Sequence, residues 1–144
     1  VRQMWVELTA TDATGQVLVS SGHLDPKGEL EPETRNLNSE GMGDNFHFAI
    51  DPWVVTAFSR HDTIPPKGYK EIYFGLLPVV SKGEVQVSVR LRYRQASQKV
   101  AEKLLGAVPD DIDLEKTYGL SAVPELPVVD MAQVATSFPA MEGD

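Results

Sequence analysis

The three histidines are the first residues to test for metal chemistry, because neutral imidazole is a common ligand for metals. His23, His47 and His61 are 24 and 14 residues apart, and none lies in an H-x-H or H-E-x-x-H pattern. A site with three histidine ligands would therefore need distant loops to converge. Solvated histidines, or histidines satisfied inside the core, are the simpler interpretation, and we expect no metal site.

Carboxylates are abundant, but their spacing does not mark a catalytic or calcium site. The EF-hand pattern D-x-[DN]-x-[DN]-G is absent, and nothing singles out a pair for glycoside hydrolysis. We expect solvated acidic loops instead. Two loops carry four carboxylates each: Asp25, Glu29, Glu31 and Glu33 in one, and Asp110, Asp111, Asp113 and Glu115 in the other.

Signatures of nucleophilic catalysis are also missing. The chain has no G-x-S-x-G motif, no glycine-rich phosphate loop and no cysteine. Ser21 precedes His23 closely, but adjacency in sequence does not make a triad. Without cysteine there is no disulfide, no thiolate and no covalent haem attachment through C-x-x-C-H. We therefore expect a protein that is not an enzyme.

A basic stripe stands out in an acidic chain. Arg90, Arg92 and Arg94 alternate along one face of a strand, while the formal net charge is −8, which disfavours nucleic-acid binding. The favoured interpretation is pairing with acidic residues such as Glu7 and Glu71 on neighbouring strands. In the alternative, the stripe docks carboxylates of a partner, and Trp53 joins it as an interaction surface.

The elements that must position these side chains are mainly strands. Residues 84–94 alternate strictly, with Val85, Val87, Val89, Leu91 and Tyr93 expected inside, and residues 4–21 form a hairpin. We also expect a strand at 69–77 and, over 45–58, either two short strands separated by Pro52 or one strand with a kink there. Residues 22–44 are expected as a loop or as a run that contains short elements, and residues 59–68 as a loop. Residues 97–106 are expected as a helix, and 123–138 as an edge strand or polyproline segment followed by a possible last strand.

Together these elements predict one domain over residues 1–144. The fold class is all-β: an antiparallel β-sandwich of six to eight strands with Ig-like, Greek-key connections, and an open barrel is the alternative. No apolar stretch reaches the length of about 20 residues that spans a bilayer. The chain begins at Val1 without an initiator Met, so we expect a fragment of a longer protein.

The order of short motifs resembles the C-terminal non-haem β-domain of exported bacterial multihaem c-type cytochromes. The resemblance covers nearly the whole chain, and its specificity comes from the ordered combination rather than from any single piece. The matching pieces are Trp5–Thr9, the Asp12-x-x-Gly15 turn, Ser21–Leu30, Ile64-Pro65-Pro66-x-Gly68, Val87–Arg94 and Leu126–Ala132.

This resemblance implies an accessory or structural role beside an upstream haem-bearing module or another redox protein in respiratory electron transfer. It implies export to the periplasm or exterior, with haem c only in the upstream part and no cofactor in this chain. His47 and His61, which flank the aromatic stretch around Trp53, are the candidates to donate a ligand to a neighbouring haem. The alternative is a stand-alone extracellular carbohydrate-binding or adhesion module that uses Trp5, Trp53, Tyr69 or Phe46 for stacking.

Overall fold

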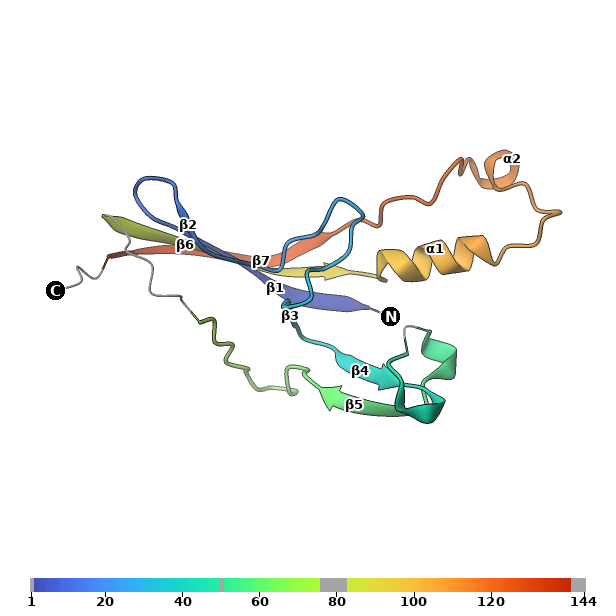
Figure 1. Ribbon diagram of the computed structural model, residues 1–144, viewed down its shortest axis with the longest axis horizontal. Coiled ribbons are helices and arrows are strands. Elements are labelled where there is room, and N and C mark those ends of the chain that lie inside the picture. Colours follow the sequence, from blue (N-terminus) through green and yellow to red (C-terminus); the bar gives the residue numbers. More distant parts are fainter. Residues whose placement is uncertain (1, 50, 76–82, 141–144) are drawn as a thin grey trace.

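Antiparallel β-structure dominates the chain, as the sequence predicts. The computed structural model describes residues 2–49, 51–75 and 83–140. It contains a five-stranded sheet, a two-stranded sheet and two α-helices (Figure 1). This confirms the fold class and is consistent with a β-sandwich in which the second layer is small.

The five-stranded sheet is built around β1 (Gln3–Thr11) and β6 (Glu84–Arg94). These two strands pair without interruption from Gln3 opposite Arg94 to Thr11 opposite Gln86. The strand order is β2-β1-β6-β7, and β3 (Arg35–Asn36) also pairs with β1. β2 (Val17–Ser21) completes the predicted hairpin, and β7 (Val129–Pro139) forms the opposite edge.

The β1–β2 turn forms where the Asp12-x-x-Gly15 pattern places it. The Asp12 carboxylate accepts hydrogen bonds from the backbone N–H groups of Thr14 and Gln16, at 2.9 and 3.0 Å. Gly15 takes a φ of +84°, a region that L-residues with a side chain adopt at a cost. Local chemistry alone therefore explains this hairpin.

The smaller sheet corrects the prediction for residues 22–58. β4 (Ser39–Met42) lies inside the predicted loop, and its partner β5 (Ala57–His61) begins only where the predicted strands end. Two 3₁₀ turns, η1 (Asp44–Phe46) and η2 (Pro52–Val54), replace the expected strands. Pro52 has no N–H for a ladder, and this segment buries too little apolar surface to reward pairing.

The predicted strand at 69–77 is also wrong over its described part. Residues 69–75 form no regular element, and residues 76 and 77 lie outside the described residues. Tyr69 and Tyr73 are 80% and 76% exposed, whereas Ile72 and Phe74 are half-buried, so the alternation of burial persists although no strand forms. Its residues favour a strand, but no strand of the described residues lies beside the segment to form backbone hydrogen bonds with it.

The predicted helix forms as α1 (Gln98–Gly106), directly after β6. The Ser97 side chain caps it by accepting a hydrogen bond from the backbone N–H of Val100. A second short helix, α2 (Leu114–Tyr118), follows with Asp113 as its N-cap and Gly119 at φ +69° as its C-cap. Both helices lie beyond one end of the large sheet (Figure 1).

Burial in the large sheet is uneven. Trp5, Val6 and Ala10 of β1 are buried, and so is Val85 of β6, as expected. Val87, Val89, Leu91 and Tyr93 are only half-buried, which corrects the expectation of a fully covered face. Every residue of β7 is exposed, although the strand pairs with β6 along most of its length.

Candidate functional site

The arginine stripe forms ion pairs within its own sheet. Arg92 donates from Nη1 to Glu7 Oε2 at 2.6 Å and from Nε to Asp130 Oδ1 at 2.9 Å. Glu7 on β1 and Asp130 on β7 therefore hold Arg92 from both sides. The predicted pairing with Glu7 is confirmed, whereas Glu71 accepts a hydrogen bond from the Tyr73 hydroxyl instead.

Arg94 is buried, which corrects the expectation that it reaches solvent or a partner. It is 1% exposed, its Nε donates to Gln3 Oε1 at 2.6 Å, and its Nη1 donates to the Gly28 carbonyl. Its guanidinium lies over the Trp5 ring at 5.8 Å. Burial lowers the pKa of Arg94 below its ordinary value, against the opposing charges of Glu29 and Asp25.

Arg90 is the accessible member of the stripe. Its side chain is 39% exposed, and its contacts with Glu7 and Asp130 are 3.8 and 3.7 Å long. Both distances exceed a hydrogen bond, so its donors are loosely held. Only this end of the stripe is arranged to receive an external carboxylate.

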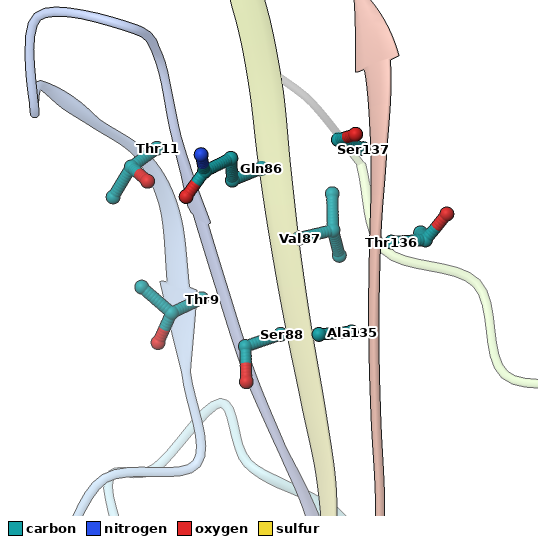
Figure 2. Close-up of a pocket in the computed structure, with 8 residues that line it drawn as sticks. All are labelled: Thr9, Thr11, Gln86, Val87, Ser88, Ala135, Thr136 and Ser137. Carbon is teal, nitrogen blue, oxygen red and sulfur yellow. The ribbon is translucent and has the colours of Figure 1, made fainter.

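A shallow trough of about 400 Å³ lies on the large sheet (Figure 2). Ser88, which lines it, is two residues from Arg90 on β6 and therefore on the same face of that strand. The register sets Thr9, Ser88 and Ala135 side by side, and Thr11, Gln86 and Ser137 form the next row. Small side chains on three adjacent strands leave the hollow, and their hydroxyl groups make it polar. The lining residues are Thr9, Thr11, Gln86, Val87, Ser88, Ala135, Thr136 and Ser137.

Sequence reasoning missed this trough, although its signal is present. Thr9 and Thr11 alternate on β1, Gln86 and Ser88 on β6, and Ala135 and Ser137 on β7. Each pair occupies the polar face of its strand, but only the register shows that the three pairs coincide.

His23 lies at the edge of this face and not beside Ser21. Its Nε2 is 3.3 Å from Thr9 Oγ1, and its Nδ1 is 3.8 Å from Glu7 Oε2. The second distance is too long for a hydrogen bond, and Arg92 already occupies Glu7. The group therefore resembles a catalytic triad in composition but lacks the contact that orients the base.

The smaller sheet carries exposed aromatic side chains, which we call the aromatic hairpin. Phe46 and Phe48 are 85% and 74% exposed, and Trp53 is 60% exposed. Phe46 also has a φ of +59°, which is uncommon for a bulky residue and is associated with functional sites. Its members are Phe46, Phe48, Trp53 and Phe58, from η1, η2, β5 and the segment between them.

The two candidate haem ligands do not converge. His61 pairs with Ser39 at one end of the β4–β5 ladder, and the backbone carbonyl of His47 accepts from Gly43 beyond the other end. Both are exposed, and the Ser39 hydroxyl lies 3.0 Å from His61 Nδ1. Within the described ranges, no three His, Asp or Glu side chains are placed to hold a metal ion.

Asp62 follows β5 and forms a small ion-pair group with Lys70 and Arg60. The hydrogen bond from Lys70 lowers the pKa of Asp62 below its ordinary value, and the Arg60 charge acts in the same direction. This group connects β5 to the irregular segment that follows it. Trp53 lies in η2, between the strands of the smaller sheet, whereas the arginine stripe lies on β6 of the large sheet. The predicted interaction residues are therefore spread over two sheets.

Comparison with known proteins supports the fold. Neither a protein-family model nor a curated protein sequence matches the chain. The crystal structure of a penta-heme cytochrome c552 from Thermochromatium tepidum is similar, with a TM-score of 0.55 and 18% sequence identity. The similarity covers 96% of this chain and 30% of that one.

The likeness does not extend to haem attachment. This chain has no cysteine, so it contains no C-x-x-C-H motif and cannot bind haem c covalently. Among the described residues, no helix is long and apolar enough to cross a membrane. The chain therefore has a fold similar to one part of a multihaem cytochrome, without the residues that attach the haems.

Proposed function

We propose that this chain is a non-catalytic interaction domain of an exported multihaem cytochrome, and that it packs against a haem-bearing module. The observation that carries the proposal is the structural match. Nearly all of this chain resembles less than a third of a penta-heme cytochrome, and this chain contains no haem-attachment motif. A part of a cytochrome without haem ligands has a supporting role by default.

The exposed apolar surface supports this proposal. Monomeric domains rarely expose large contiguous apolar patches, and such patches mark contact sites. Here the aromatic hairpin exposes several large apolar side chains, Phe46, Phe48 and Trp53 among them. Aromatic side chains are enriched at protein interfaces because they bury much apolar area with few rotatable bonds. We therefore assign the haem-bearing module to the aromatic hairpin.

The arginine stripe contributes less to this docking than the sequence suggests. Arg94 is enclosed and Arg92 is held by two carboxylates. Arg90 alone has a loosely held guanidinium for an acidic group of the partner. In the interface that we propose, the aromatic hairpin therefore supplies most of the contact area, and Arg90 supplies one charged contact.

A second function, carbohydrate binding, is favoured by the same aromatic side chains. Trp53 and Phe46 are exposed enough to stack on sugar rings. The hydroxyl-lined trough does not help this function, because it lies on the other sheet. The two proposals therefore predict different ligands for one surface.

The test expresses residues 1–144 with a tag as a separate chain in the native host and purifies them from the cell envelope, so that any haem recovered is held by contact with a haem-bearing module and not by a covalent link to the tag. We expect c-type haem to co-elute in stoichiometric amount, as measured by its absorption spectrum. Phe46→Ser with Trp53→Ser should lower the haem recovered at least about tenfold, equivalent to about 1.4 kcal/mol. Tyr118→Ser on α2, where the side chain is 67% exposed, is the matched control and should change nothing.

A haem-free eluate from the unaltered protein would overturn the cytochrome proposal. Retention on an immobilised glycan array that is lost in the Phe46→Ser, Trp53→Ser variant would then favour carbohydrate binding. Loss of haem in the Tyr118→Ser control as well would place the contact elsewhere on the surface.

A further inference from the structure

The outer edge of β7 is long, and no strand of the described residues pairs with it. β7 is 11 residues long, and every one of them is exposed. It ends the strand order β2-β1-β6-β7, so no described strand pairs with its outer side. The opposite side of the sheet ends in shorter strands, since β2 has five residues and β3 has two. An edge of this kind presents a row of free N–H and C=O groups to another strand.

This edge lacks the features that usually prevent pairing. Proteins protect edge strands with lysines, internal prolines, bulges or very short length. The segment 132–138 contains no charged residue and no proline, and the bulge opposite Leu91 and Arg92 lies before it. Pro139 only ends the strand. Its residues are Ala132, Gln133, Val134, Ala135, Thr136, Ser137 and Phe138.

We infer that residues 132–138 pair antiparallel with the same residues of a second copy of this chain, about a two-fold axis at Ala135. This joins two large sheets into one continuous sheet. It does not depend on the proposed cytochrome function, because it uses the opposite part of the molecule from the aromatic hairpin.

The register about Ala135 matches side chains by size and by face. Val85 pairs with Phe138, and Val89 with Val134, so Phe138 and Val134 lie on the apolar face. The two-fold register sets Phe138 opposite the partner copy's small Ala132 and Val134 opposite its Thr136. Directly opposed residues share a face, so Phe138 meets the Ala132 methyl group and Val134 meets the similarly sized, β-branched Thr136 across the junction.

The polar face is matched in the same register. Gln133 lies opposite Ser137, and Ala135 opposite itself. Ala135 and Ser137 line the trough on β6 and β7, so the troughs of the two copies adjoin at the axis. The dimer that we infer therefore carries one longer hydroxyl-lined trough across its centre.

Charge selects the antiparallel direction. Asp130 is the only charged residue of β7, and it lies near one end of the strand. In the register about Ala135 the two copies of Asp130 are about 34 Å apart, at about 3.4 Å per residue over ten residues. Parallel in-register pairing would bring them within about 5 Å of each other, where like charges repel.

Sedimentation equilibrium of the purified protein tests the association. We expect a dimer for the unaltered chain. Val134→Lys with Thr136→Lys places like charges directly opposite each other and should raise the dissociation constant at least about tenfold. Val129→Lys with Met131→Lys adds the same charge to exposed positions outside the paired segment and should leave the dimer intact. Circular dichroism checks that both variants are folded.

Cross-linking tests the register, and it is clean because the chain has no cysteine of its own. Ala135→Cys places two thiols opposite each other at a Cα separation of about 5 Å, within disulfide range, so mild oxidation should give a covalent dimer. Met131→Cys is the control, since its two copies are more than about 25 Å apart in this register.

A monomeric unaltered protein at about 100 µM would overturn the inference, because even a weak specific dimer forms at that concentration. A dimer that withstands the Val134→Lys, Thr136→Lys change, or that cross-links at residue 131 as readily as at residue 135, would show a different interface. Failure of the cytochrome proposal leaves these outcomes unchanged, and the reverse also holds.

Discussion

At the scale of single residues, the arginine stripe contains side chains that stabilise the large sheet and one side chain that remains accessible to a partner. Arg94 and Arg92 lie 5.8 and 5.9 Å from the Trp5 ring, and the Trp5 Nε1 donates to the Gly22 carbonyl at 2.9 Å. Glu7, 8% exposed, neutralises Arg92 from the same face. Three arginines of one pattern therefore have different roles, because their depth in the sheet differs.

The matched substitutions Arg92→Gln and Arg90→Gln test this division. Loss of Arg92 leaves the buried Glu7 carboxylate without its hydrogen-bonded partner, so we expect unfolding free energy to fall by about 3 kcal/mol. Loss of the loosely paired Arg90 should cost about 0–1 kcal/mol. Urea denaturation of both variants measures the difference. Equal costs would mean that the short contacts of Arg92 add nothing to stability.

At the scale of elements, the segment after β2 matters as much as the strands. Residues 22–34 return across β1 to β3, and their backbone carbonyls accept hydrogen bonds from Trp5 Nε1 and from Arg94 Nη1. Gly22 lies so close to β1 that a Cβ would be 2.4 Å from the Val6 carbonyl oxygen. Residues 22–34 can therefore pack this closely against β1 because Gly22 has no side chain.

Gly22→Ala and Gly15→Ala form a matched pair, because both glycines have a φ of +84°. A Cβ at Gly15 meets nothing within 4 Å, so its replacement should cost only the strain of about 1 kcal/mol. Replacement of Gly22 adds a backbone clash, and we expect a total of about 3 kcal/mol. Thermal melting measures both, and Trp5 fluorescence should shift to longer wavelength only in Gly22→Ala. Similar melting of the two variants would contradict the close approach.

At the scale of the whole molecule, the two sheets differ in their support. The large sheet has buried residues on both faces of β1, whereas every residue of β5 is exposed. A two-stranded sheet is marginal on its own and depends on what it packs against. The aromatic hairpin is therefore the region most open to stabilisation by a partner.

Amide hydrogen exchange should reveal this difference. We expect β1 and β6 to exchange at the rate of global unfolding, and β4 and β5 to exchange through local opening. Protection factors for β5 should be lower than those for β6 by at least about tenfold, which is 1.4 kcal/mol of opening free energy. Mass spectrometry of peptides from the two segments makes the comparison, and equal protection would mean that both sheets unfold together.

The elements with their own local signals were predictable. The β1–β2 hairpin, β6 and α1 have strict alternation, an Asp-Gly turn or a serine cap, so short-range chemistry explains them. The 45–58 and 69–77 segments also have strand-forming residues, yet their described parts become 3₁₀ turns and irregular chain apart from the start of β5. Residues with high strand propensity form a strand only when a partner strand lies beside them, and the sequence pattern does not show which segments become neighbours.

The candidate sites divide in the same way. The arginine stripe is visible in sequence because period 2 is a property of one strand, and Glu7 was a correct partner for that reason. Asp130 was missed, since the bulge between β6 and β7 decides which residue of β7 faces Arg92. The trough was missed as well, because it exists only where three strands align.

The sequence by itself determined the antiparallel β character, the first hairpin, the helix after β6 and the absence of covalent haem. These follow from residue types and their order within short segments. Only the tertiary structure decided that Arg94 is buried, that His47 and His61 stay apart, and that β7 has an open edge. Burial, convergence and exposure depend on which distant segments pack together, and the free energy of that packing is shared over the whole chain.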